Sequence, residues 1–279
     1  MLVTALTFAC LALPSATNAA AIITDVTGKA ALQGGGKVGP VAILSEIESN
    51  ARVQLEKGAR VVALYTSSGD EFALSGPALI HFRPDAPVAL SGALPQKRSS
   101  AIGKEAAIRI RSAATTQAAY VMRSTRSAAR IRLLVLSATR TLETSPEFRW
   151  QGVEGSTAYR FELTDDTGKA LYDTEVTGET VKLPVSLQLQ PGTAYTWEVA
   201  TRTPDGRRHV SAGDFSVAAA ELRQRANLLR PPAGAAVSDR VAYAAWLDQM
   251  ELRDEARKYW RALVNERPAD ARLKALAEN

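Results

Sequence analysis

Alternating apolar and polar residues predict short β-strands over most of the chain up to about residue 217. In one such stretch Tyr195, Trp197 and Val199 alternate with Thr196 and Glu198, which places the three apolar side chains on one face of a strand. A slip by one residue would bury Glu198, so the core face of this strand is well specified. The same alternation occurs in two other aromatic pairs, Phe148/Trp150 and Tyr159/Phe161.

A turn signal stands directly before this strand. Pro191 fixes its own φ and Gly192 tolerates a positive φ, so the pair predicts a tight turn. The run Leu-x-Pro-Gly-x-x-Tyr that ends at Tyr195 resembles the corner of a fibronectin type III-like sandwich, where the Tyr hydroxyl bonds back to the upstream backbone. This resemblance predicts a fibronectin type III-like β-sandwich over residues 141–217.

Residues 20–93 have an all-β pattern, with short apolar runs separated by Gly and Ser-Gly-Asp turns. We expect strands at Ala51–Leu55, Val61–Tyr65, Phe72–Leu74 and Ala78–Phe82. Four motifs in this region resemble the FecR-type periplasmic domain: Ser45-Glu46-Ile47, Ala51–Leu55, Ser68–Leu74 and Ser75–Ala78. The resemblance implies a FecR-like β domain, a module of protein interaction and signalling.

The sequence pattern over residues 218–279 predicts helices. A first covers Ala219–Leu229 and ends at Pro231, a second begins at a Ser238 or Asp239 cap and runs to about Met250, and a third covers Glu255–Val264. Val237–Asp270 has the 34-residue length of a tetratricopeptide unit. It resembles that family at Ala244, Ala256, Trp260 and Pro268, with Ala271–Ala277 starting another helix.

One such unit cannot bury its apolar face alone. The face carrying Tyr243, Leu247 and Trp260 must therefore pack on Ala219–Leu229, on the sandwich or on a partner. We expect these three residues to hold a partner's peptide or helix. The whole chain is thus predicted to be multidomain and mainly β, with a small helical C-terminal unit.

The first 19 residues predict a cleavable export signal. An apolar run at 2–13 is followed by Pro14 and small residues, which favours cleavage after Ala19. The alternative is a membrane anchor, but the run is short for a bilayer. The single cysteine, Cys10, lies in this signal, and no later stretch is long and apolar enough for a membrane helix. We expect a periplasmic protein without thiol chemistry or a transmembrane segment after cleavage.

Segment 94–140 predicts a basic linker containing a helix and an entry strand. It carries ten Lys or Arg residues and one acid, Glu105. One interpretation is a solvated linker. The other is docking on an acidic or membrane-bound envelope partner, with Arg109, Arg111, Arg123 and Arg126 as contacts; an exported protein is not expected to bind nucleic acid.

No catalytic constellation is present in the sequence. His81 and His209 are the only histidines, and neither has a second ligand at metal-binding spacing. No Gly-x-Ser-x-Gly motif or phosphate loop occurs. We therefore expect no cofactor and no enzyme activity. The prediction is an exported binding or scaffold protein of the cell envelope that mediates protein–protein interaction; the alternative is a peptidoglycan or polysaccharide ligand-binding protein.

Overall fold

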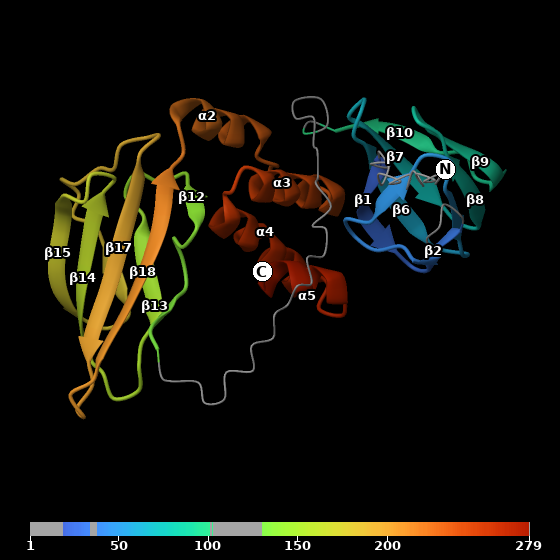
Figure 1. The fold of residues 1–279 in the computed structure, drawn as a ribbon. Helices are drawn as coiled ribbons and strands as arrows, with labels where there is room; N and C mark the ends of the chain where they lie inside the picture. Colours follow the sequence, from blue (N-terminus) through green and yellow to red (C-terminus); the bar gives the residue numbers. More distant parts are fainter. Residues whose placement is uncertain (1–18, 34–37, 101, 103–129, 279) are drawn as a thin grey trace, which may run out of the picture.

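Two β modules flank a small group of helices (Figure 1). The computed structural model describes residues 19–33, 38–100, 102 and 130–278. We name the three parts the first β domain (19–100), the sandwich (130–217) and the helical unit (220–278). The chain is therefore mainly β with a small C-terminal helical unit, as the sequence predicts at this level.

The first β domain consists of two five-stranded antiparallel sheets, ordered β10-β7-β6-β1-β4 and β3-β2-β5-β8-β9. Its core takes side chains from both sheets, including Ile23, Val53, Phe72 and Ile80, because alternate residues of each strand face inward. The strands are β1 Ala19–Thr27, β2 Ala30–Gln33, β3 Gly39–Pro40, β4 Glu46–Glu48, β5 Arg52–Leu55, β6 Arg60–Tyr65, β7 Asp70–Ser75, β8 Ala78–Phe82, β9 Pro87–Gly92 and β10 Gln96–Ser99.

Strand β10 extends the first β domain beyond the expected boundary at residue 93. It pairs antiparallel with β7, although Gln96–Ser99 contains no apolar residue that would mark a strand. Ion pairs accompany the backbone pairing: Lys97 Nζ lies 2.8 Å from Asp70 Oδ2, and Arg98 Nε lies 2.8 Å from Glu71 Oε2. The start of the basic segment is thus part of a sheet.

The sandwich has a three-stranded sheet, β11-β13-β16, and a five-stranded sheet, β12-β18-β17-β14-β15. The alternating aromatics form its core; the Phe148 ring lies 4.8 Å from Phe161 and 5.2 Å from Trp197. The strands are β11 Arg132–Leu133, β12 Thr139–Thr141, β13 Glu147–Gln151, β14 Ala158–Asp165, β15 Ala170–Thr177, β16 Thr180–Lys182, β17 Ala194–Arg202 and β18 Arg208–Val217.

The corner predicted at Pro191-Gly192 has the expected geometry. Gly192 has a φ of 83°, which explains why glycine is suited to this position. The backbone N–H of Gln190 donates to the Tyr195 hydroxyl at 2.8 Å. The turn therefore fixes the entry of β17 through the Tyr195 side chain.

The helical unit contains α2 Ala220–Leu229, α3 Val237–Gln249, α4 Arg253–Glu266 and α5 Ala271–Glu278. The sequence placed the cap of the second helix at Ser238 or Asp239, and this is wrong, since the N-cap is Ala236 and has no side-chain cap bond. Ser238 is buried, and Asp239 pairs with Arg98 of the first β domain. Tertiary contacts therefore replace the expected cap.

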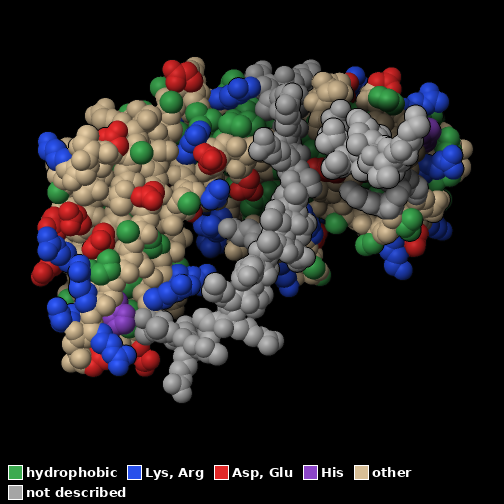
Figure 2. Space-filling model, viewed as in Figure 1, with side chains coloured by type: hydrophobic (Ala, Val, Ile, Leu, Met, Phe, Trp, Pro, Cys, Tyr) green, Lys and Arg blue, Asp and Glu red, His purple; other side chains and the backbone are tan. Residues whose placement is uncertain are grey.

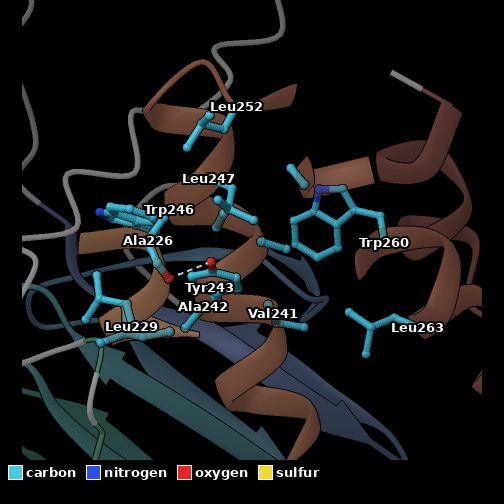
Figure 3. Packing of buried hydrophobic residues seen from close by; sticks show 14 of the residues in the cluster. Ala226, Leu229, Val241, Ala242, Tyr243, Trp246, Leu247, Leu252, Trp260 and Leu263 are labelled. Atoms are coloured by element: carbon cyan, nitrogen blue, oxygen red, sulfur yellow. Dashed lines mark hydrogen bonds between the residues drawn. The ribbon is translucent and has the colours of Figure 1, made fainter. Parts of the chain in front are cut away.

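Helix α2 shares one apolar core with α3 and α4 (Figure 3). The Tyr243 hydroxyl of α3 donates to the Ala226 carbonyl oxygen of α2 at 2.8 Å. Trp246 and Leu247 lie in the same core, with Trp260 and Leu263 contributed by α4. Of the three packing arrangements open to this face, the structure shows packing on the preceding helix.

Candidate functional site

A hollow of about 810 Å³ lies between the sandwich and the helical unit. One wall comes from β11, the residues after it and β13; the other comes from α4 and α5. The cations that line this hollow are Arg132, Arg149, Arg257, Lys258, Arg261 and Lys274. Its apolar lining consists of Leu133, Leu134, Val135, Val264 and Ala277. We call this hollow the basic groove.

The basic groove has a strong excess of positive charge. Only two carboxylates, Asp254 and Glu278, line it beside the six cations. Asp254 is already engaged, because Oδ1 pairs with Arg257 at 2.7 Å and Oδ2 accepts from the Leu136 N–H at 2.7 Å. Lys and Arg side chains gather where the sandwich faces the helices (Figure 2). The groove is therefore suited to an anionic ligand.

Direct hydrogen bonds hold the two walls of the groove together. The Thr139 hydroxyl donates to the Glu251 carbonyl oxygen at 2.9 Å, and the Arg140 N–H donates to the same oxygen at 2.8 Å. Arg253 Nη1 donates to the Ala138 carbonyl oxygen at 2.8 Å. Since both walls are fixed before a ligand arrives, the arrangement is pre-organised.

The helical unit is also joined to the first β domain through Glu71, Arg98, Ser238 and Asp239, which we call the junction cluster. Glu71 and Ser238 are buried, whereas Arg98 and Asp239 are partly exposed. Arg98 pairs with Glu71 at 2.8 Å and, through Nη2, with Asp239 at 3.2 Å. Glu71 is fully buried, and this burial raises its pKa above the usual value, although the Arg98 charge opposes the shift. The cluster thus ties two modules together at a charged, partly buried point.

Apolar and ionic contacts extend this second junction. Ile43, Leu64 and Ile102 belong to the same buried cluster as the helical core. Arg267 Nη1 donates to Asp25 Oδ1 at 2.6 Å. The helical unit therefore contacts both β modules, in agreement with its position between them (Figure 1).

The predicted partner residues Tyr243, Leu247 and Trp260 are core residues in the structure. Each is at most 1% exposed. Trp260 Nε1 donates to Asp248 Oδ2 at 2.8 Å. These side chains lie in the core that the helices share, so the structure offers no open surface at these residues.

The four predicted basic contacts, Arg109, Arg111, Arg123 and Arg126, lie outside the described residues. Other cations of segment 94–140 are placed. Lys97 and Arg98 belong to β10, Arg140 pairs with Glu251 at 3.1 Å, and Arg132 lines the basic groove.

Sequence reasoning missed the groove residues outside that segment. Arg257, Arg261 and Val264 follow a spacing of four and three residues along α4, so they share one helix face. That spacing was the available signal. Arg149 stands between Phe148 and Trp150, so the alternation predicts only that it faces outward from its strand. Its meeting with Arg132 depends on the pairing of β11 with β13, which the sequence does not specify.

The described residues include neither a metal-ligand cluster nor a membrane-spanning helix. No cluster of three or more His, Cys, Asp or Glu residues there could hold a metal ion. His81 lies in β8, and His209 in β18 lies 3.4 Å from the Thr203 hydroxyl. Within the described ranges, none of the helices has both the length and the apolar character needed to cross a membrane.

Comparison with known proteins identifies no family. No protein-family model and no curated protein match the chain. Among solved structures, CopC from Methylosinus trichosporium OB3b is 21% identical with a TM-score of 0.26, and the alignment covers 33% of this chain and 96% of CopC. The chicken CNTN1 FN1–FN3 domains are 13% identical with a TM-score of 0.23, and the alignment covers 71% of this chain and 57% of that one. Similarities this low carry no functional argument.

Proposed function

We propose that this protein is a non-enzymatic binding and scaffold protein of the cell envelope that mediates protein–protein interaction in a signalling or assembly system. The observation that carries the proposal is the basic groove, which is built jointly by the sandwich and the helical unit. A surface formed by two locked modules presents its side chains in a fixed arrangement, which favours binding.

The finer assignments of the modules are part of this proposal. The first β domain is FecR-like by its sequence motifs, and the helical unit is tetratricopeptide-like by its residue spacing. The fibronectin type III-like assignment of the sandwich is supported by the bond between Gln190 and Tyr195. All three module types serve interaction rather than chemistry.

Export to the periplasm rests on the N-terminal sequence. Strand β1 begins at Ala19, and Ala20 and Ala21 are buried. Cleavage after Ala19 would therefore leave a mature chain that starts inside this strand. N-terminal sequencing of protein purified from periplasmic extract is expected to begin at Ala20; a chain retained in the cytoplasm with its first residues intact would refute export.

The alternative ligand is peptidoglycan or another polysaccharide. Its support is the same excess of cations, since acidic cell-wall polymers are also anionic. However, the exposed large hydrophobic residues among the described positions are aliphatic, and an exposed aromatic stripe, which would favour sugar rings, is not among them. A protein partner is therefore the proposal, and a glycan is one outcome of the test.

The test is affinity capture from an envelope extract with three matched baits. The first is the native chain. The second carries Arg132→Glu, Arg261→Glu and Lys274→Glu in the basic groove. The third carries the control changes Arg52→Glu, Lys57→Glu and Arg83→Glu on the first β domain, where the three cations are exposed and enter no ion pair among the described residues.

The proposal predicts that one protein is recovered by the native and control baits and lost with the groove bait. Because both altered baits have the same net charge, non-specific attraction falls equally in the two. Recovery of cell-wall fragments alone would support the alternative. Equal recovery by all three baits would show that the groove is not needed for partner binding.

A further inference from the structure

Four cations of the basic groove are available to a ligand. Arg132, Arg149, Arg261 and Lys274 are exposed and form no ion pair with any described acidic side chain. They come from both walls of the groove. Like charges gathered in this way repel one another, and a ligand carrying several carboxylates relieves that repulsion.

The apolar lining of the groove adds a second requirement. Leu134 is 44% exposed, and Val264 on α4, which also lines the groove, is only partly buried. Covering such a side chain removes apolar surface from water, which is favourable. A ligand matched to this surface therefore carries an apolar group between its carboxylates. An acidic peptide can supply both, while an acidic sugar polymer lacks the apolar side chain.

The chain's own basic segment is not a matching occupant. Between residues 103 and 129 it contains five Lys or Arg residues and one acidic residue. Such a segment has the same sign of charge as the groove and would add to the repulsion. The complementary occupant must come from another molecule.

We propose that the basic groove binds an extended acidic segment of a partner protein, with carboxylates at Arg132, Arg149, Arg261 and Lys274 and one apolar side chain on Leu134. This inference rests on the proposed function and names its ligand class. The volume of about 810 Å³ lies within the range of about 300–1,000 Å³ typical of ligand sites. At about 3.3 Å per extended residue, the occupant is a short segment, not a folded domain.

The test is a fluorescence anisotropy titration of the full chain with two labelled probes. One is a peptide of about eight residues in which Glu and Leu alternate, matching the strand period. The other is a Glu peptide of the same length. The proteins are the native chain, the groove and control charge-reversal variants described above, Leu134→Asn, and Val185→Asn as an exposed aliphatic control on the sandwich (91% exposed).

The proposal predicts that the groove variant binds the Glu-Leu peptide at least about tenfold more weakly than the native chain, since three ion pairs become three repulsions. The control variant should stay within about twofold, because its cations lie on another module. Leu134→Asn should weaken binding of the Glu-Leu peptide about three- to tenfold and leave binding of the Glu peptide nearly unchanged. Val185→Asn should change neither. The neutral set Arg132→Gln, Arg261→Gln and Lys274→Gln repeats the test should the reversed chain fail to fold.

Three results would overturn the proposal. One is the absence of binding at low salt. Another is an equal loss in the groove and control variants, which would indicate non-specific attraction. The third is displacement of the peptide by soluble peptidoglycan fragments at lower concentration than by unlabelled peptide, which would identify a glycan site. If the titration fails while the capture experiment still recovers a groove-dependent protein, only the ligand class is wrong and the proposed function stands.

Discussion

A single buried carboxylate, Glu71, should give the protein a measurable pH dependence. Its pKa is raised above 4.5 chiefly by burial. Arg98, Asp239, Thr24 and Ser238 face it from β10, α3 and β1. Between the unfolded and folded pKa values the folded chain retains a proton that the unfolded chain has released. The free energy of unfolding therefore falls as pH rises through this window.

The variant Glu71→Gln does not titrate, so it isolates this effect. We expect the free energy of unfolding of the native chain minus that of Glu71→Gln to fall as pH rises above 4.5. Urea denaturation of both proteins at several pH values measures this difference. A difference that stays constant or rises with pH would show that Glu71 is not held in a buried site.

At the sandwich corner, the Tyr195 hydroxyl is the group to test. Tyr195→Phe removes the acceptor of the Gln190 N–H and should cost about 1 kcal/mol of stability. Tyr172→Phe is the control, because its hydroxyl has no hydrogen-bond partner among the described residues. Thermal unfolding compares the two. Equal midpoints for Tyr195→Phe and the native chain would mean that the corner bond contributes nothing.

At the scale of elements, the helical unit depends on α2, α3 and α4 sharing one core. Trp260→Ala should cost about 3–5 kcal/mol, since it empties a fully buried aromatic site, whereas Leu228→Ala at a site 72% exposed should cost under about 0.5 kcal/mol. Chemical denaturation measures both. A stable Trp260→Ala chain that loses only a partner would return Trp260 to the interaction surface and contradict its placement in the core.

Elements that the sequence predicts well carry their own signals. Phe148 and Trp150 alternate with polar residues, and Pro191-Gly192 precedes Tyr195, so the strands and their turn follow from local chemistry. Strand β10 and the start of α3 carry no such local signal. Gln96–Ser99 has no apolar residue that would mark a strand. Ser238 and Asp239 are residue types that often cap a helix, but in the structure they belong to the junction cluster. Tertiary ion pairs determine where these two elements form, and such pairs cannot be read from the local sequence pattern.

At the scale of the whole molecule, the basic groove was not predictable for the same reason. Arg132 belongs to a segment whose basic character is visible in the sequence. In the sequence Arg261 and Lys274 look like ordinary helix-surface cations, and only the structure shows that α4 and α5 face the sandwich. Their meeting depends on long-range bonds such as that between Thr139 and Glu251. The sequence could predict the separate modules, and the groove arises where the sandwich and the helical unit meet.

The two junctions should hold the modules in one arrangement. We expect the variant Arg98→Ala with Arg267→Ala to broaden the distance distribution between the first β domain and the sandwich, because it removes the pairs to Asp239 and Asp25. Spin labels at Arg83→Cys and Val185→Cys in a Cys10→Ala chain report this distance by pulsed electron paramagnetic resonance. An unchanged distribution would show that apolar packing alone fixes the modules.

The most direct test of the account is photo-crosslinking in living cells from the apolar lining of the basic groove. A photoreactive amino acid replaces Leu134 in one chain and Val185, an exposed control position on the sandwich, in another. The account predicts a covalent adduct from position 134 whose crosslinked peptide is acidic, and no such adduct from position 185. If position 134 yields no adduct, an adduct with glycan only, or the same products as position 185, the groove is not the site of protein recognition.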